Sequence, residues 1–145
     1  IGRYCGGYLP ACGALTADDQ ALREHGLVAL DRVFDLIEAL SPNEALAQIM
    51  GFIGEINRYL ERMAPWTQAK QGRSDRVATI LYTSAEALRL ASLLLQPVLP
   101  ERMLEVWRRL GWQPPDSLRD GLFWGLLQPG SAVIAGPPLF PRDIV

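Results

Sequence analysis

The chain has 145 residues, of which 49% are hydrophobic and 21% are charged, and its formal net charge at pH 7 is −2. This length suits one domain with a single core, and the apolar content excludes a disordered chain. The slightly negative charge excludes a protein that binds nucleic acid over its whole surface, so any such contact must be local.

The first residues have the pattern of a helix end. Gly6 and Gly7 supply the left-handed backbone that often ends a helix, so we interpret Ile1–Cys5 as the last turn of a helix that lies mostly before this sequence. The chain begins with Ile rather than Met, and we therefore expect it to be part of a longer protein. For Cys5 and Cys12, the only cysteines, free thiols are the simpler interpretation and a disulfide is the alternative.

A first complete helix is predicted over residues 17–40. Thr16 is a typical N-cap residue, and Asp18 and Asp19 place negative charge in the first turn, where it favours a helix. Gly26 weakens the helical pattern and indicates the close approach of a neighbouring helix. The side chains expected to face the core repeat every three or four residues and are Leu27, Leu30, Phe34, Ile37 and Leu40.

A second helix is predicted over residues 42–63. Ser41 and Glu44 have the spacing of a capping box, and Pro42 suits the first helical position. Because only a cap separates this helix from the first, the two should form an antiparallel hairpin. The expected core stripe consists of Leu46, Ile49, Ile53, Ile56, Leu60 and Met63.

Two further helices are predicted beyond a turn at Pro65. Ser74 can cap the third helix, Pro97 and Pro100 end it and begin the fourth, and Gly111 should end the fourth. The expected core side chains are Val77, Ile80, Leu81, Ser84, Leu88, Ala91 and Leu95 in the third helix and Met103, Leu104, Trp107 and Leu110 in the fourth.

The sequence changes character after residue 112. Residues 113–145 contain repeated Pro and Gly, which exclude long helices, and only residues 132–135 have the pattern of a short extended segment. We therefore predict an all-α fold, with an antiparallel helix bundle over residues 1–112, whose first helix is truncated, and an irregular Pro/Gly-rich C-terminal tail over residues 113–145. This apolar tail is expected to pack on the bundle or on a partner domain. No apolar run approaches the ~20 residues of a membrane span, so no membrane is expected as a partner.

The sequence carries no recognisable catalytic or metal-binding motif. It has no P-loop, no Gly-x-Gly-x-x-Gly, no His-Glu-x-x-His and no Gly-x-Ser-x-Gly. His25 is the only histidine, and together with two cysteines it does not make up a zinc site. We therefore predict no catalytic residue and no metal site in this chain.

The turn at Pro65 is the most distinctive local feature. Pro65 suits the first position of a new helical turn, and Trp66 follows it beside backbone N–H groups that should be unpaired. An aromatic side chain with nearby cations can stack an unpaired base and hold its phosphate. A packing anchor on a solvated helix face explains the same residues, so the residues alone indicate a helical binding or interaction domain. The cations that flank the turn are Arg62, Lys70, Arg73 and Arg76.

Residues 57–70 (NRYLERMAPWTQAK) closely resemble the signature helix and turn in the anticodon-binding domain of the methionyl-tRNA synthetase family. Three further stretches agree with that family in order. They are residues 94–101 (LLQPVLPE) followed by Leu110-Gly111, residues 124–130 (WGLLQPG) and residues 138–142 (PLFPR). The resemblance covers essentially the whole chain, and four ordered motifs are far more specific than one.

The resemblance implies the C-terminal anticodon-binding domain of a cytoplasmic enzyme that ligates methionine to its tRNA with ATP, through a methionyl-adenylate. The catalytic domain, with its ATP and Mg sites and any zinc-bearing insertion, would lie before Ile1. This chain would then recognise tRNA without catalysing the reaction and without a cofactor of its own. The expected partners are the anticodon of a methionine tRNA and the enzyme's own catalytic domain.

Trp66 matches the tryptophan that stacks on the anticodon in this family. The asparagine and arginine that read base edges in the family lie on the helix preceding Tyr4, outside this sequence. Arg62, Lys70, Arg73 and Arg76 carry no family role and are candidate phosphate contacts by charge and position alone. Two alternatives stay open: the equivalent bundle of another class I synthetase, and a helical protein-interaction module that has lost tRNA binding.

Overall fold

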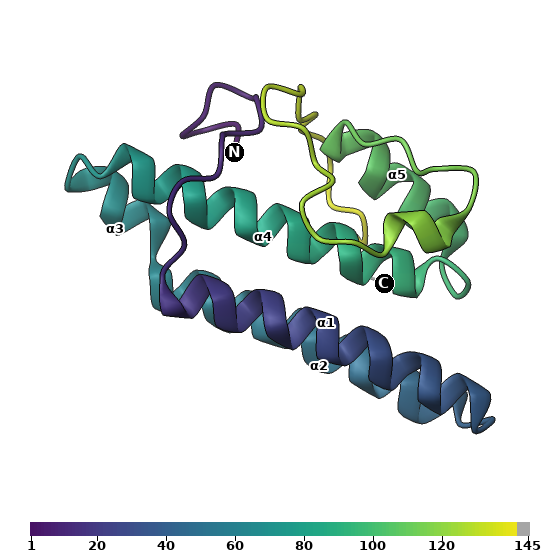
Figure 1. Ribbon diagram of the computed structural model, residues 1–145. Coiled ribbons are helices and arrows are strands. Elements are labelled where there is room, and N and C mark those ends of the chain that lie inside the picture. The colour runs from purple at the N-terminus through teal and green to yellow at the C-terminus, as the bar shows by residue number, and fades with distance from the viewer. Residues whose placement is uncertain (142–145) are drawn as a thin grey trace.

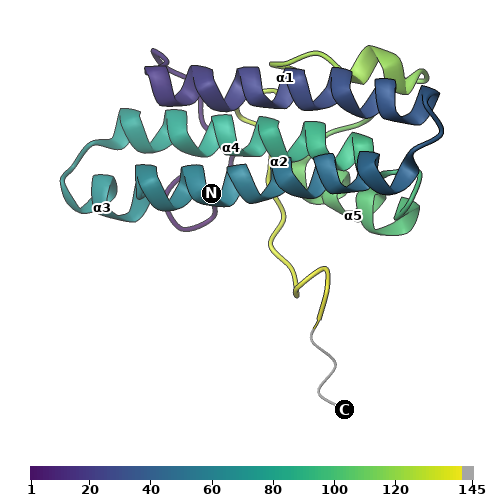
Figure 2. The same cartoon turned by 90° about the horizontal axis from the view of Figure 1, so that it is seen from below.

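Three long helices lie side by side and form the body of the molecule (Figures 1 and 2). The computed structural model describes residues 1–141, so Arg142 of the predicted terminal peptide and the three residues after it lie outside the described residues. The elements are α1 (Ala17–Glu38), α2 (Pro42–Met63), α3 (Pro65–Lys70), α4 (Ser74–Leu95), α5 (Pro100–Leu110) and a short 3-10 helix, η1 (Leu118–Gly121). The all-α prediction is confirmed.

The predicted antiparallel hairpin of α1 and α2 is present, and α4 runs back along both of them (Figure 1). The short helix α3 lies at the end where α2 turns into α4, and α5 packs on the opposite half of α4. Trp107 of α5 donates its indole N–H to Oγ of Ser92 over 2.7 Å, which ties α5 to α4 in the core. These contacts make α4 the central helix.

Among the described helices, α4 alone is long and apolar enough to cross a membrane by length and composition. However, 83% of its most apolar window is buried inside the bundle. Burial on almost every face explains why this helix shows no clear amphipathic stripe, since a helix surrounded by others is apolar all round.

The predicted core face of α1 is wrong by about one residue around the helix. Leu27 and Leu30 are only half-buried, Phe34 and Ile37 are exposed, and Leu40 is 88% exposed and lies beyond the helix. The buried positions are instead Leu22, Gly26, Ala29, Val33 and Leu36. Small side chains at the contact let α1 approach its neighbours closely, which moves the larger side chains to the edges of the contact.

Gly26 lies where α1 packs closely on α2, as its place in the sequence predicted. A Cβ at Gly26 would lie 2.7 Å from Cζ of Phe52, a ring that is fully buried and cannot move aside. We therefore expect Gly26→Ala to lower the free energy of unfolding by about 1 to 2 kcal/mol, measured by urea denaturation.

Gly51 on α2 is the matched control for Gly26. A Cβ there meets nothing within 4 Å. Alanine should therefore stabilise this position by about 0.5 to 1 kcal/mol through its higher helix propensity. A Gly26→Ala protein as stable as the Gly51→Ala protein would contradict the close packing of α1 on Phe52.

The predicted capping box at Ser41 and Glu44 is not formed. The N–H of Ser41 instead donates to the carbonyl of Leu36 over 2.8 Å, and Leu40 adopts a left-handed φ of 58°. This is the bonding of a left-handed helix end, so Ser41 closes α1 with its backbone rather than capping α2 with its side chain. The capping box forms on α1, where the backbone N–H of Thr16 donates to Oδ2 of Asp19 over 2.8 Å.

Three other side chains predicted in the core are exposed. Leu46, Leu88 and Leu104 are 37%, 41% and 55% exposed, whereas Phe52, Tyr59 and Val106 occupy the core. Periodicity gives the apolar stripe of a helix, but the neighbouring helices cover only part of that stripe. Ser74 is the first residue of α4, and Arg73 occupies the cap position that was predicted for Ser74.

The two ends of the described chain pair with each other beside α4 and α5. Leu9 is buried, donates its N–H to Ser131 and accepts from the N–H of Gly130, with distances of 2.9 and 2.8 Å. The extended segment predicted at residues 132–135 appears only as an isolated antiparallel bridge between Tyr8 and Ala132.

The predicted helix end at the start of the chain also appears. The N–H of Cys5 donates to the carbonyl of Ile1 over 2.8 Å, and Gly6 and Gly7 both have positive φ. Cys5 and Cys12 are free thiols. The division of the chain into residues 1–112 and 113–145 stays a prediction.

Candidate nucleic-acid interface

The Pro65 turn presents Trp66 at one end of the bundle. Helix α2 ends at Met63, and Ala64 takes a left-handed φ of 43° that redirects the chain. Pro65 is buried as the first residue of α3, while Trp66 beside it is 46% exposed. The ring is therefore half-covered and held on a short helix, which leaves one part of its surface available for stacking.

The backbone amides beside Trp66 differ from the prediction. Thr67 and Gln68 both donate their N–H groups to the carbonyl of Ala64, over 2.9 and 3.1 Å. These two donors are therefore paired within the turn, contrary to the prediction of unpaired N–H groups beside Trp66.

Three predicted cations lie around the turn with exposed side chains. Arg62 contacts Asp18 at 3.3 Å and Glu55 at 4.0 Å, and its side chain is 47% exposed. Arg73 donates to Oε1 of Gln68 over 3.2 Å. Lys70 forms no ion pair with any of residues 1–141. Solvated ion pairs contribute little, so these charges remain available to a polyanion.

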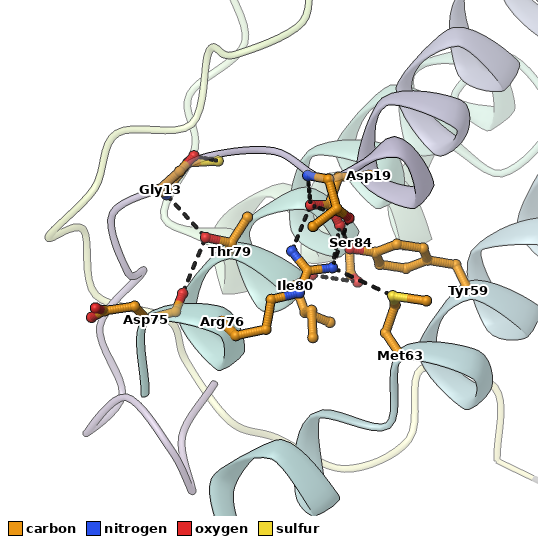
Figure 3. Close-up of polar contacts among 11 residues, drawn as sticks. Gly13, Asp19, Tyr59, Met63, Asp75, Arg76, Thr79, Ile80 and Ser84 are labelled. Carbon is orange, nitrogen blue, oxygen red and sulfur yellow. Dashed lines mark hydrogen bonds and ion pairs between the residues drawn. The ribbon is translucent and has the colours of Figure 1, made fainter. Parts of the chain in front are cut away.

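Arg76 differs from the other predicted cations because it lies in a buried network (Figure 3). Its two terminal nitrogens bond to the two carboxylate oxygens of Asp19 over 2.5 and 2.8 Å. One of these nitrogens also lies 3.2 Å from Oγ1 of Thr16 and 3.4 Å from Sδ of Met63. Such a bidentate pair commits the guanidinium to the protein, and we do not include Arg76 among the proposed phosphate contacts.

Asp19 is fully buried at the centre of this network. Its carboxylate also accepts from the hydroxyl of Tyr59 over 2.5 Å. Burial raises the pKa of Asp19, but the hydrogen bonds from Arg76, Tyr59 and Thr16 outweigh that effect and lower the pKa to about 2. Burial and the same carboxylate raise the pKa of Tyr59. Asp19 is therefore ionised and Tyr59 neutral at physiological pH.

A second buried ion pair lies further along α4. Glu86 and Arg89 are both fully buried and meet at 2.8 Å. Arg89 also donates to the carbonyls of Gly121 and Phe123, while Glu86 accepts from the N–H groups of Gly125 and Leu127. This pair fastens residues 121–127 to α4.

Neither buried network was found from the sequence. For Glu86 and Arg89 a signal existed, because they are the only charged residues between Val77 and Leu95 and have opposite signs three residues apart. For the Asp19 network, the only local signal was the capping spacing of Thr16 and Asp19, since the partners Tyr59 and Arg76 are 40 and 57 residues away.

The described residues contain no group of three or more His, Cys, Asp or Glu side chains that could hold a metal ion. The Pro65 turn itself offers a half-exposed aromatic ring, with exposed cations before and after it in the sequence. This combination suits a single-stranded nucleic acid with unstacked bases.

A family model describing the anticodon-binding domain of methionyl tRNA ligase matches residues 9–142. The chain belongs to this family. Membership of an anticodon-binding family implies tRNA binding, and it removes the alternative that this bundle comes from another class I synthetase. The family that the sequence motifs suggested is thus confirmed.

Two relatives match almost the whole of this chain. The methionine–tRNA ligase of Thermotoga maritima is 36% identical over 142 residues, which are 98% of this chain and 23% of that protein. The corresponding enzyme of Deinococcus radiodurans is 36% identical over 146 residues, covering 98% of this chain and 21% of that protein.

The fold agrees with a solved member of the family. The crystal structure of apo methionyl-tRNA synthetase from Mycobacterium tuberculosis matches with a TM-score of 0.89 and 30% identity, covering 98% of this chain and 29% of that one. The chain thus spans less than a third of the length of these relatives.

Proposed function

We propose that this domain binds the anticodon of a methionine tRNA by stacking an unpaired base on Trp66. The observation that carries the proposal is the half-exposed indole on a short helix whose only buried residue is Pro65, at the tip of the bundle. Stacking on an aromatic ring contributes ~1 to 3 kcal/mol per base and tolerates any base. The domain therefore contributes affinity at this position and leaves base identity to other groups.

Arg62, Lys70 and Arg73 supply the phosphate contacts in this proposal. They are exposed and surround the turn that carries Trp66, whereas the overall charge of the chain is −2. Local positive charge on a slightly acidic domain favours a small contact with one RNA loop over binding along a duplex.

The groups that read base edges belong, in this proposal, to a helix that ends at Ile1–Cys5. An apolar hollow of about 270 Å³ lies between α2 and α4, and Ile1, Ile53, Leu60 and Leu88 line it together with Asn57. The exposed Leu88 is explained if such a helix covers this hollow.

The whole protein, by this proposal, is a cytoplasmic enzyme that ligates methionine to its tRNA with ATP. Its catalytic portion would hold ATP, Mg and any zinc-bearing insertion and would contact this domain. The domain itself recognises tRNA and performs no catalytic step. The methionine–tRNA ligases that share the family support this assignment.

Replacing Trp66 with alanine in the full-length protein is expected to weaken binding of a methionine tRNA anticodon stem-loop about tenfold, a loss of one stacked base. The measurement is a fluorescence anisotropy titration with the labelled stem-loop. Phe123→Ala is the matched control, because Phe123 is another exposed aromatic, 65% exposed, and lies in the segment fastened by Glu86 and Arg89. Unchanged binding by the Trp66 variant would contradict base stacking.

The remaining alternative is a helical protein-interaction module that has lost tRNA binding. The same titration at two salt concentrations distinguishes the two, because contacts between cations and phosphates weaken as salt rises. Affinity for the stem-loop that falls with salt supports anticodon binding. No saturable binding at either concentration would favour the interaction module.

A further inference from the structure

We infer that Asp19, with Arg76 and Tyr59, is a positioning residue for the Trp66 turn, an inference that rests on the proposed function. Residues 64–73 connect α2 to α4 and carry Trp66 on α3. The Asp19 network holds the two points where this connection leaves the bundle, so we expect it to control how the indole is presented to RNA.

The first point is the end of α2. Tyr59 lies in the last two turns of α2 and donates its hydroxyl to Oδ1 of Asp19 over 2.5 Å. Met63, the last residue of α2, lies with its sulfur 3.4 Å from the guanidinium of Arg76. The last two turns of α2 are thus fixed through Asp19 and Arg76 (Figure 3).

The second point is the first turn of α4. Arg76 is the third residue of α4 and bonds to both carboxylate oxygens of Asp19. Two parallel bonds define the orientation of the guanidinium as well as its distance from the carboxylate. Asp19 itself is fixed on α1 by its bond from the N–H of Thr16.

The turn between these points packs on α4 and makes few contacts with the other helices. Pro65 is the only buried residue of α3, and the loop that follows is closed by its own backbone, with the N–H of Arg73 donating to Gln68 over 3.0 Å. Such a turn moves as a unit when its two ends move. Its orientation therefore depends on the buried carboxylate that joins those ends, although Asp19 does not contact the RNA.

The test compares Asp19→Asn with Glu86→Gln in the full-length protein. Both substitutions neutralise a buried carboxylate that is paired with an arginine, but Glu86 fastens residues 121–127 and not the Trp66 turn. Amide hydrogen exchange is measured at a temperature where both variants are folded. We expect faster exchange of residues 64–73 in Asp19→Asn only, and equal exchange of these residues in the two variants would overturn the inference. Tyr59→Phe, which removes a single hydroxyl, provides a milder variant with the same expected direction.

A double-mutant cycle with Trp66→Ala then tests the link to RNA. If Asp19 acts through Trp66, Asp19→Asn weakens stem-loop binding about five- to tenfold alone and less than about twofold in the Trp66→Ala background. Full additivity of the two losses would overturn the positioning role. If Trp66→Ala alone leaves binding unchanged, the proposed function fails, whereas hydrogen exchange of residues 64–73 still decides whether Asp19 positions the turn.

Discussion

Replacing Arg89 with methionine is expected to lower the free energy of unfolding by about 3 to 5 kcal/mol. Methionine leaves the carboxylate of Glu86 fully buried without its positive partner, and a buried unpaired charge is costly. It also removes the donors to the carbonyls of Gly121 and Phe123. Guanidinium denaturation followed by circular dichroism measures the loss.

The control for this prediction is Arg58→Met on α2. Arg58 also pairs with a glutamate three residues earlier, Glu55, and their distance is 2.7 Å, but the Arg58 side chain is 61% exposed. Water replaces the lost contact there, so the expected change is at most about 1 kcal/mol. If the two variants lost equal stability, burial would not be the reason that Glu86 and Arg89 matter.

Residues 121–127 should also become less firmly attached to α4 when Arg89 is replaced. Residues 121–127 have few bonds of regular structure and are joined to α4 by side chains, including the hydroxyl of Tyr82, which donates to the carbonyl of Leu127 over 2.9 Å. Relative to the wild-type protein, the methionine variant should therefore show faster amide exchange at Gly125 and Leu127, with a smaller change in α1. Stability and attachment of the tail depend on the same pair.

Helix boundaries were predictable because they depend on neighbouring residues in the chain. Pro42, Pro65 and Pro100 begin helices at the positions expected from their fixed φ and missing N–H. Gly111 ends α5 with a φ of 65°, as a C-terminal glycine should. The family motifs were likewise visible, because they are short and ordered along the sequence.

The buried face of α1 was not predictable from periodicity alone. Periodicity favours the stripe with the largest side chains, but the small residues Gly26 and Ala29 are the ones that allow α1 to pack closely. Which stripe is buried depends on the shape of the other helices, and that information is distributed over the whole chain.

The candidate site was partly predictable for the same reason. Trp66 was identified because proline and tryptophan are adjacent in a family motif, and its half exposure agrees with the proposed role. The different environment of Arg76 was not predictable. It depends on Asp19 of α1, which is 57 residues earlier in the chain and lies 2.8 Å from the Arg76 guanidinium.

The contribution of the Asp19 network to stability should be lost in acid. The pKa of Asp19 is lowered from 3.8 to about 2 in the folded protein, so the folded state binds its proton less readily than the unfolded state does. The stabilisation is therefore present above about pH 4 and is lost as the pH falls toward 2. At 1.36 kcal/mol per pKa unit, the loss through this one group is about 2 kcal/mol.

Comparison with Asp19→Asn isolates this contribution from those of other carboxyl groups. The pKa of Glu105 is also lowered to about 2, through hydrogen bonds from Arg108 and Arg109, and it titrates equally in both proteins. Urea denaturation at pH 5 and pH 2 should therefore show the advantage of the wild-type protein over the variant shrinking by about 2 kcal/mol at the lower pH. An advantage that is the same at both pH values would mean that Asp19 has an ordinary pKa and that its bonds to Arg76 and Tyr59 do not favour its charged form.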